Sequence, residues 1–260
     1  MQLLIALREL PMAVGWPPFG IASGLEFGFA IVLVVSFALV AWGMRAVTVI
    51  GALWGALIAF LIYVAGGFGG FLTLVTLFVL TAVSTRLGYS KKHRLNTAEK
   101  EHGRAASQVL ANLGAAALCG LPLLFVDVMS AVLLAGMVAG LAEAAADTVS
   151  SEVGQVLGRR TVLITTFKPT EAGRNGGVSA AGTLAGVLAA CAVVMVAMLT
   201  KVISPGQFWV VAVFAIAGML LDSVLGATLE RPGKLGNDSV NFSSSSFSAF
   251  GAVLVTYLLG

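Results

Sequence analysis

The longest apolar stretch of the chain runs from Phe27 to Val64, and Arg45 is its only charged residue. A helix needs about 20 apolar residues to cross the hydrocarbon core of a bilayer. This stretch therefore predicts two membrane-spanning helices that turn near Gly43 to Arg45. Further apolar runs predict six more spans, near residues 68–85, 107–125, 128–146, 179–200, 208–228 and 247–259.

Composition supports a membrane protein. Of 260 residues, 58% are hydrophobic and only 10% are charged, which is too apolar for an ordinary soluble domain. We expect an all-α fold, a polytopic membrane helix bundle of about eight transmembrane helices with cytoplasmic polar loops. Residues 1–26 mix apolar runs with charges and prolines, so they are expected to form a retained interfacial or re-entrant segment before a membrane-embedded domain over residues 27–260.

The placement of positive charge predicts the topology. All but two of the fifteen Lys and Arg residues, Arg8 and Lys201, fall in segments assigned to one side. An excess of Lys and Arg marks cytoplasmic loops, so residues 86–106, 147–178 and 229–243 are predicted to share the cytoplasmic face. For a bacterial chain this means the inner, or plasma, membrane. The formal net charge is only +3; we expect no nucleic-acid partner, and the oligomeric state stays open.

Two stripes of acidic and small residues lie at the ends of predicted spans. The first holds Glu143, Asp147, Ser150 or Ser151, Gly154 and Gly158 on one helical face, provided that the helix continues past Asp147. The second repeats Gly218, Asp222, Gly226 and Glu230 every four residues. Carboxylates near hydrocarbon are costly unless they face protein, water or a cation. Glycines let a phosphate or another backbone come close.

These acids predict a magnesium site, because Mg²⁺ takes oxygen ligands and keeps waters and substrate phosphates in its shell. Asp147 and Asp222 are the first candidates for ligands, followed by Glu152 and Glu230. We expect Asp147 and Asp222 to approach each other closely enough to share one site. The alternative is that the acids cap helices or pair with Arg159, Arg160 or Arg231.

The segment FKPTEAGRNGGVS offers groups that would bind phosphate. Lys168 and Arg174 supply positive charge, and Asn175, Gly176 and Gly177 supply backbone N–H donors before a helix N-terminus. A flexible loop with the usual positive bias is the alternative. The basic segment from Lys91 to Arg104 is expected to recruit an anionic substrate without taking part in the chemistry. No nucleotide-binding P-loop or nucleophile elbow appears, and the two histidines have no partners for a metal site.

Several motifs carry a family resemblance. The run from Asp147 to Arg159 resembles the D-x-x-A-x-x-x-G-x-x-x-G-R run of membrane-embedded phytol and dolichol kinases. More closely, KKHRLNTAEKEHGRAASQVLAN, ADTVSSEVG, RNGGVSAAGT, LDSVLGATLE and NDSVNF are similar, in that order, to an integral-membrane family. This family contains plant phytyl-phosphate kinase and animal transmembrane protein 19. Ala145 departs from the Asn expected before the Ala-Asp-Thr run.

The resemblance implies a kinase-like domain that transfers phosphate from CTP or another nucleoside triphosphate to an isoprenoid monophosphate. Asp147, Asp222, Lys168 and Arg174 would then be catalytic. Nucleotide and phosphate groups would be bound by Ser151, Gly154, Gly158, Arg159, Asn175, Gly176, Gly177, Ser179 and Asn241, and substrate would be recruited by Lys91, Lys92, Arg104 and Asn112. A transporter or flippase, or a nucleotidyltransferase that makes a CDP-lipid, could use similar groups.

Overall fold

The structure is a computed structural model that describes residues 24–94, 103–125 and 129–260. The expected all-α membrane bundle is confirmed, and seven of the described helical segments are long and apolar enough to span a membrane. The helices are α2 (Gly24–Gly43), α3 (Val49–Arg86), α4 (Tyr89–Arg94), α5 (Ala106–Gly120), α6 (Ser130–Leu157), α7 (Ala180–Leu199), α8 (Phe208–Leu225) and α9 (Asn237–Leu259). Short elements complete the fold: the 3-10 turns η1 (Leu121–Leu124) and η2 (Pro205–Gln207), the π turn η3 (Gly226–Glu230), and the antiparallel strands β1 (Val162–Leu163) and β2 (Gly177–Val178).

Helix α3 is folded back on itself at Gly67, where the backbone leaves the helical region with φ 62° and ψ −161°. A positive φ of this kind favours glycine. Beyond the bend, a Cβ on Gly70 would lie 2.9 Å from the carbonyl oxygen of Ile62, which a straight helix does not allow. Each arm has about 18 residues and a length of about 27 Å at 1.5 Å per residue. The two arms therefore correspond to the two spans predicted over residues 46–64 and 68–85.

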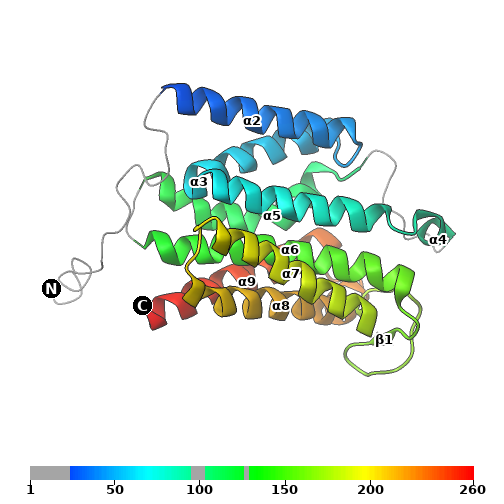
Figure 1. The fold of residues 1–260 in the computed structure, drawn as a ribbon. Helices are drawn as coiled ribbons and strands as arrows, with labels where there is room; N and C mark the ends of the chain where they lie inside the picture. The colour runs from blue at the N-terminus through cyan, green and yellow to red at the C-terminus, as the bar shows by residue number, and fades with distance from the viewer. Residues whose placement is uncertain (1–23, 95–102, 126–128) are drawn as a thin grey trace.

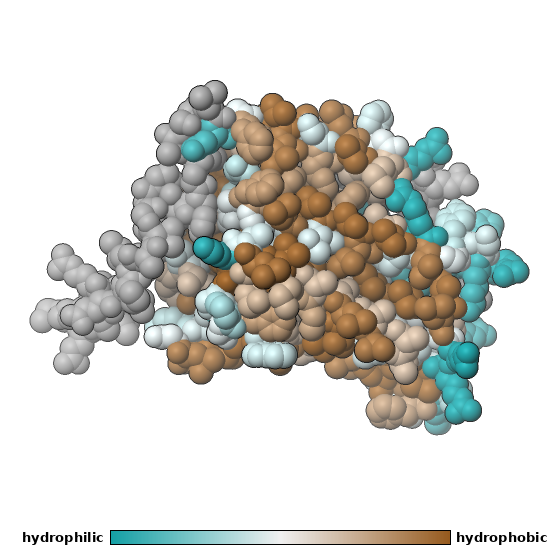
Figure 2. All heavy atoms as spheres, in the orientation of Figure 1, coloured by the Kyte–Doolittle hydropathy of each residue, from teal (hydrophilic) through white to brown (hydrophobic). Residues whose placement is uncertain are grey.

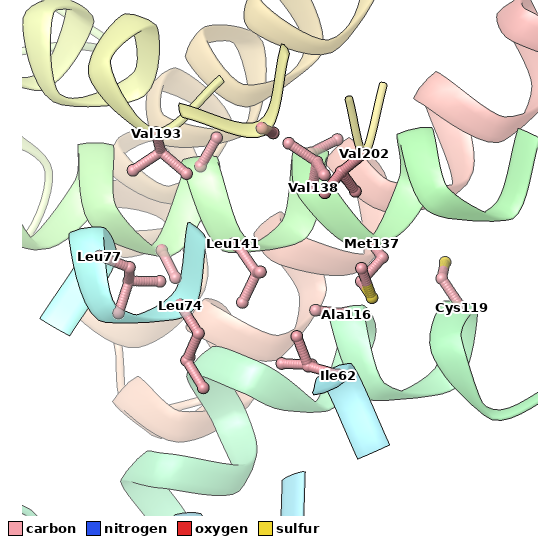
Figure 3. Packing of buried hydrophobic residues seen from close by; sticks show 14 of the residues in the cluster. Ile62, Leu74, Leu77, Ala116, Cys119, Met137, Val138, Leu141, Val193 and Val202 are labelled. Atoms are coloured by element: carbon pink, nitrogen blue, oxygen red, sulfur yellow. The ribbon is translucent and has the colours of Figure 1, made fainter. Parts of the chain in front are cut away.

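Helix α6 forms the centre of the bundle. In Figure 1 it lies between α7, α8 and α9 on one side and α3 and α5 on the other, with α2 outermost. Figure 3 shows Met137, Val138 and Leu141 of α6 packed among apolar side chains from α3, α5 and the α7 region. Because α6 contacts so many helices, most of its residues are buried in protein, including the polar residues Glu143, Thr148 and Glu152.

The connections that carry most of the charge gather at one end of the bundle, here called the polar end (residues 44–48, 86–94, 103–105, 158–179 and 226–236). Arg86 donates through Nη2 to the carbonyl oxygen of Met44 at 2.9 Å, and Lys91 donates to that of Val156 at 2.8 Å. Figure 2 shows hydrophilic residues at this end and hydrophobic residues along the sides. The three predicted loop regions thus share one end, while their cytoplasmic location stays a prediction.

Two predicted loops are shorter than expected, because the loop predicted over residues 147–178 begins later and the loop before the last span ends earlier. Residues 147–157 belong to α6, so the acidic stripe is helical, as its spacing requires. Helix α9 already begins at Asn237, although NDSVNFSSSS was interpreted as loop. Its serine hydroxyls bond to carbonyls one turn back, as in Ser243 to Ser239 at 2.7 Å and Ser248 to Ser244 at 3.2 Å. Small serines also let α9 pack closely on its neighbours. The prediction for residues 1–26 falls almost entirely outside the described residues.

Candidate functional site

A small polar cavity of about 110 Å³ opens at the polar end, between α6, α8 and the loop that precedes α7. Liquid water occupies about 30 Å³ per molecule, so the cavity has room for a hydrated ion or a few phosphate oxygens. Its lining is almost entirely polar: Asp147, Ser150, Ser151, Gly154, Gln155, Thr161, Gly173, Arg174, Asn175, Gly176, Gly177, Val178, Ser179, Asp222, Ser223, Gly226, Glu230 and Asn237.

Asp147 and Asp222 come from different helices and line this one cavity. Their carboxylates lie close enough to repel each other, and Glu230 adds a third negative charge. Asp147 lies about 26 Å along α6 from its first residue, and Asp222 about 21 Å along α8. Both therefore lie beyond the middle of their helices, toward the polar end.

Neighbouring polar groups hold Asp222 in place. The hydroxyl of Ser244 donates to Oδ2 of Asp222 at 3.1 Å. The side-chain nitrogen of Asn241 donates to the same oxygen at 3.2 Å in the amide orientation that matches donors with acceptors. Both residues belong to α9, so this helix fixes one acidic residue of the cavity.

Glu143 lies one helical turn before Asp147 and is almost fully buried, with 2% of its surface exposed. Its charge would interact with those of Asp147 and Asp222. Its Oε1 atom has no hydrogen-bond partner among the described residues. A buried polar atom without a partner is uncommon and calls for an explanation such as a bound ion or water. The sequence placed Glu143 on the acidic stripe without giving it a role.

The Asn-Gly-Gly turn forms the opposite wall. Gly176 has φ 78°, and a Cβ there would overlap Ala227 of η3, directly after α8, so only glycine fits this contact. The N-terminus of α7 follows at once, where the hydroxyl of Ser179 accepts from the N–H of Gly182 at 3.2 Å. Helix N-termini favour anions because their N–H groups and dipole point outward.

The cavity meets the chemical requirements of a magnesium–phosphate site. In the described residues, the one ion pair within 4 Å is Lys92–Glu152, so Asp147, Asp222 and Glu230 are not neutralised by a described cation in direct contact. This argues against the alternative in which these acids pair with arginines. No group of three acidic, His or Cys side chains in the described ranges is close enough to hold a metal alone. Mg²⁺ commonly takes one or two carboxylates plus waters and phosphates, which two aspartates can supply.

Comparison with known proteins identifies the family. The model of the family described as integral membrane protein DUF92 matches residues 32–249. The chain belongs to this family.

Relatives of this DUF92 protein occur in bacteria, plants and archaea. An uncharacterised membrane protein of Synechocystis is 35% identical over 77% of this chain and 76% of its own length. Protein PGR of Arabidopsis thaliana is 31% identical over 79% of each chain. The chloroplast protein VTE6 of Arabidopsis thaliana is 29% identical over 74% of this chain and 60% of its own. No solved structure matches this chain significantly.

Most of the phosphate-binding residues predicted for this DUF92 protein fall at the cavity. Ser151, Gly154, Arg174, Asn175, Gly176, Gly177 and Ser179 line it. Gly154 and Gly158 also let the backbone approach α7, since each lies against Ser179. Lys168 and Arg159 are exposed and outside the lining. The geometry therefore gives these two residues no contact with the predicted site.

Two of the predicted site residues, Glu152 and Lys92, bind each other. The Lys92 side chain is fully buried and donates to Glu152 and to the carbonyls of Ser84 and Thr85. Glu152 lies outside the lining of the polar cavity, so the structure gives it no contact with the predicted metal site. Lys92 is likewise not an exposed charge available to substrate. Nothing in the sequence indicates this pairing across 60 positions.

Arg104 and Asn112, which were also predicted to recruit substrate, line a second and larger cavity between α2, α3 and α5. The sequence missed several groups at both cavities. Ser223, Gln155, Thr161 and Asn237 line the polar cavity, and Arg45 and Arg86 line the larger one. Of these, only Ser223 had a local signal, because it follows Asp222 directly.

Proposed function

We propose that this protein is a membrane-embedded, Mg²⁺-dependent phosphotransferase. It would move the γ-phosphate of a nucleoside triphosphate, with CTP as the first to test, to an isoprenoid monophosphate such as phytyl or another prenyl phosphate, and so form the diphosphate. The observation that carries the proposal is the single polar cavity lined by Asp147, Asp222 and Arg174 at the N-terminus of α7. The resemblance to a family that contains plant phytyl-phosphate kinase supports the same reaction.

In this reaction Asp147 and Asp222 would hold the metal, which screens the charge of the phosphates when bound. Arg174, Ser179 and the backbone N–H groups near Gly177 would orient the transferring phosphate. An oxygen of the lipid monophosphate attacks the γ-phosphorus. The bond from that phosphorus to the β–γ bridging oxygen breaks, and the nucleoside diphosphate leaves. Because the attacking oxygen is already ionised, no side chain has to remove a proton.

Two other functions use similar groups. A nucleotidyltransferase would attach the nucleotide to the lipid, with loss of diphosphate. A transporter or flippase would use buried acids such as Glu143 along a path. The position of Asp147 and Asp222 toward one end, and not at the bilayer midplane where transporters bind their substrates, favours the kinase.

The deciding experiment incubates purified protein with phytyl phosphate and CTP labelled at either the γ- or the α-phosphate. We expect γ-label in the lipid, loss of this signal with EDTA and its return with Mg²⁺. Asp147→Asn should lose most of this signal. Glu171→Gln is its matched control, because Glu171 is an exposed carboxylate at the polar end that lies outside the cavity. Transfer of α-label would mean nucleotidyl transfer. Transfer of neither label by folded protein would reject both enzymatic functions.

A further inference from the structure

The larger cavity has a volume of about 510 Å³, within the usual range of small-molecule sites of about 300–1,000 Å³. Its lining comes from α2, both arms of α3, the start of α5 and Ala144 of α6. Most of this surface is apolar, with Phe37, Leu74, Leu77, Phe78 and Leu113 among its side chains. The space is therefore suited to a hydrocarbon chain.

One end of this cavity is positively charged. Arg45, Arg86 and Arg104 line it, from three segments that are far apart in sequence. They meet because the turn after α2 is bonded to the segment before α5. The N–H of Arg104 donates to Ala46 at 3.0 Å, and the N–H of Thr48 donates to Arg104 at 3.0 Å. Neither Arg45 nor Arg86 forms an ion pair with a carboxylate of the described residues.

Arg45 is held in an unfavourable backbone conformation, with φ 56°. Glycine is the usual residue at such a helix end. Here an arginine occupies the position and lines the cavity. Backbone strain of this kind is typical of functional sites, where the side chain is needed at that place.

The two cavities lie on neighbouring faces of α6. Ala144 lines the apolar one and Asp147 the polar one, three residues further along. The charge of Arg104 is close enough to interact with Asp147. A phosphate bound at the arginines would thus lie next to the cavity where the nucleotide phosphates are expected.

We infer that the cavity between α2, α3 and α5 binds the acceptor lipid, a prenyl monophosphate, with its hydrocarbon chain among the apolar side chains and its phosphate at Arg45, Arg86 and Arg104. The inference rests on the proposed function for its choice of lipid. Arginine suits a phosphate head group because its guanidinium can donate two parallel hydrogen bonds. Helix α2, whose outer side chains are largely exposed, packs chiefly on α3 and forms the outer wall of the cavity.

The test measures binding of tritiated phytyl phosphate to the full chain in phosphatidylcholine nanodiscs without nucleotide. We expect phytol, which lacks the phosphate, to compete at least about tenfold more weakly, as for loss of charge-assisted hydrogen bonds. Arg104→Gln and Arg45→Gly should each raise Kd by about tenfold or more. Arg45→Gly relieves the backbone strain, so a binding loss there reflects lost charge and not misfolding. Ala38→Phe should fill the cavity and lower binding further.

Arg160→Gln is the matched control, since it removes an exposed charge of the polar end that lines neither cavity. Competition by phosphatidic acid as strong as by phytyl phosphate would overturn the inference in favour of a general phospholipid site. Unchanged binding in both Arg45→Gly and Ala38→Phe would mean that the lipid does not bind in this cavity. Lipid phosphorylation with an unchanged KM in these two variants would leave the proposed function intact and reject the inference. If the variants changed lipid binding as expected but the protein transferred no γ-label, the lipid site would stand and the proposed function would be rejected.

Discussion

The two cavities differ in how their walls are built. Around the polar cavity, glycines let the helices touch: a Cβ on Gly182 of α7 would lie 2.6 Å from the carbonyl oxygen of Ser150 in α6, and one on Gly218 of α8 would lie 2.7 Å from Cγ of Glu143. The apolar cavity is closely packed at its charged end, where a Cβ on Gly51 would lie 2.8 Å from the carbonyl oxygen of Arg104. Its outer wall, α2, has little of its surface covered, and a Cβ on Gly28, toward the far end of that helix, would meet no atom within 4 Å. Tight packing suits fixed ligands for a metal and phosphates. The looser wall suits a substrate that enters from the bilayer.

The largest effect is expected from the acids of the polar cavity. Asp147→Asn and Asp222→Asn should each lower kcat for phosphoryl transfer by about 10²–10³-fold, as for loss of a preorganised charge at the reacting centre. Because both carboxylates serve one site, the double variant should lose little more than either single one. Steady-state kinetics with saturating Mg²⁺ measures this.

Glu171→Gln serves as control and should keep full activity. Retention of most activity in either aspartate variant, while the protein stays folded, would mean that the polar cavity is not the reaction site. Strictly additive losses would mean that the two aspartates act separately.

Sequence patterns predicted the parts that depend on local composition. Apolar runs predicted the spans, and the clustered Lys and Arg indicated that the loops share one end. The similar four-residue spacing around Asp147 and around Asp222 led to the prediction that the two would share one site, and both line one cavity. Each of these signals is contained within one turn or one span.

What the sequence did not predict depends on contacts between distant segments. Ser244 suggested a loop, yet its hydroxyl bonds to the carbonyl oxygen of Asn241 within α9 at 3.0 Å and to Asp222 of α8 at 3.1 Å. Lys92 had the appearance of a solvated charge because its partner lies 60 residues away. The arginines at positions 45, 86 and 104 meet only after the bundle is formed.

The Lys92–Glu152 pair joins α4, which follows the second arm of α3, to the central helix α6. Lys92→Met should destabilise the protein by about 3–5 kcal/mol, because it leaves a buried carboxylate without its partner. The double variant Lys92→Met/Glu152→Leu should recover much of this loss, because no buried charge remains. Thermal unfolding in detergent measures both.

Lys91→Met is the control, because the exposed Lys91 bonds only to a carbonyl at the end of α6 among the described contacts. If Lys92→Met proved as stable as the control but lost substrate affinity, Lys92 would belong to the binding site, as the sequence first suggested.

The difference in packing can be tested with glycines. Gly218→Ala should destabilise by about 1–3 kcal/mol, the usual cost of overpacking, since its Cβ would overlap the hydroxyl of Ser248. Gly28→Ala, in the open wall of α2, should be neutral or stabilising by up to about 1 kcal/mol, because alanine is the better helix former. Equal shifts in the apparent Tm of the two variants would contradict the contrast between the walls.

The smallest effect concerns two basic residues of one loop. Arg174 lines the polar cavity, whereas Lys168 is exposed outside it. Arg174→Gln should raise the KM for the nucleotide or lower kcat by about tenfold, the value of one charge-assisted hydrogen bond to phosphate. Lys168→Gln should change either constant by less than about twofold at physiological salt, where exposed charges are screened beyond about 8 Å. Because both variants remove one positive charge from the same loop, a general electrostatic effect would change both alike. A loss in Lys168→Gln as large as in Arg174→Gln would therefore show that the loop closes over the nucleotide during turnover, and the boundary of the polar cavity would have to include Lys168.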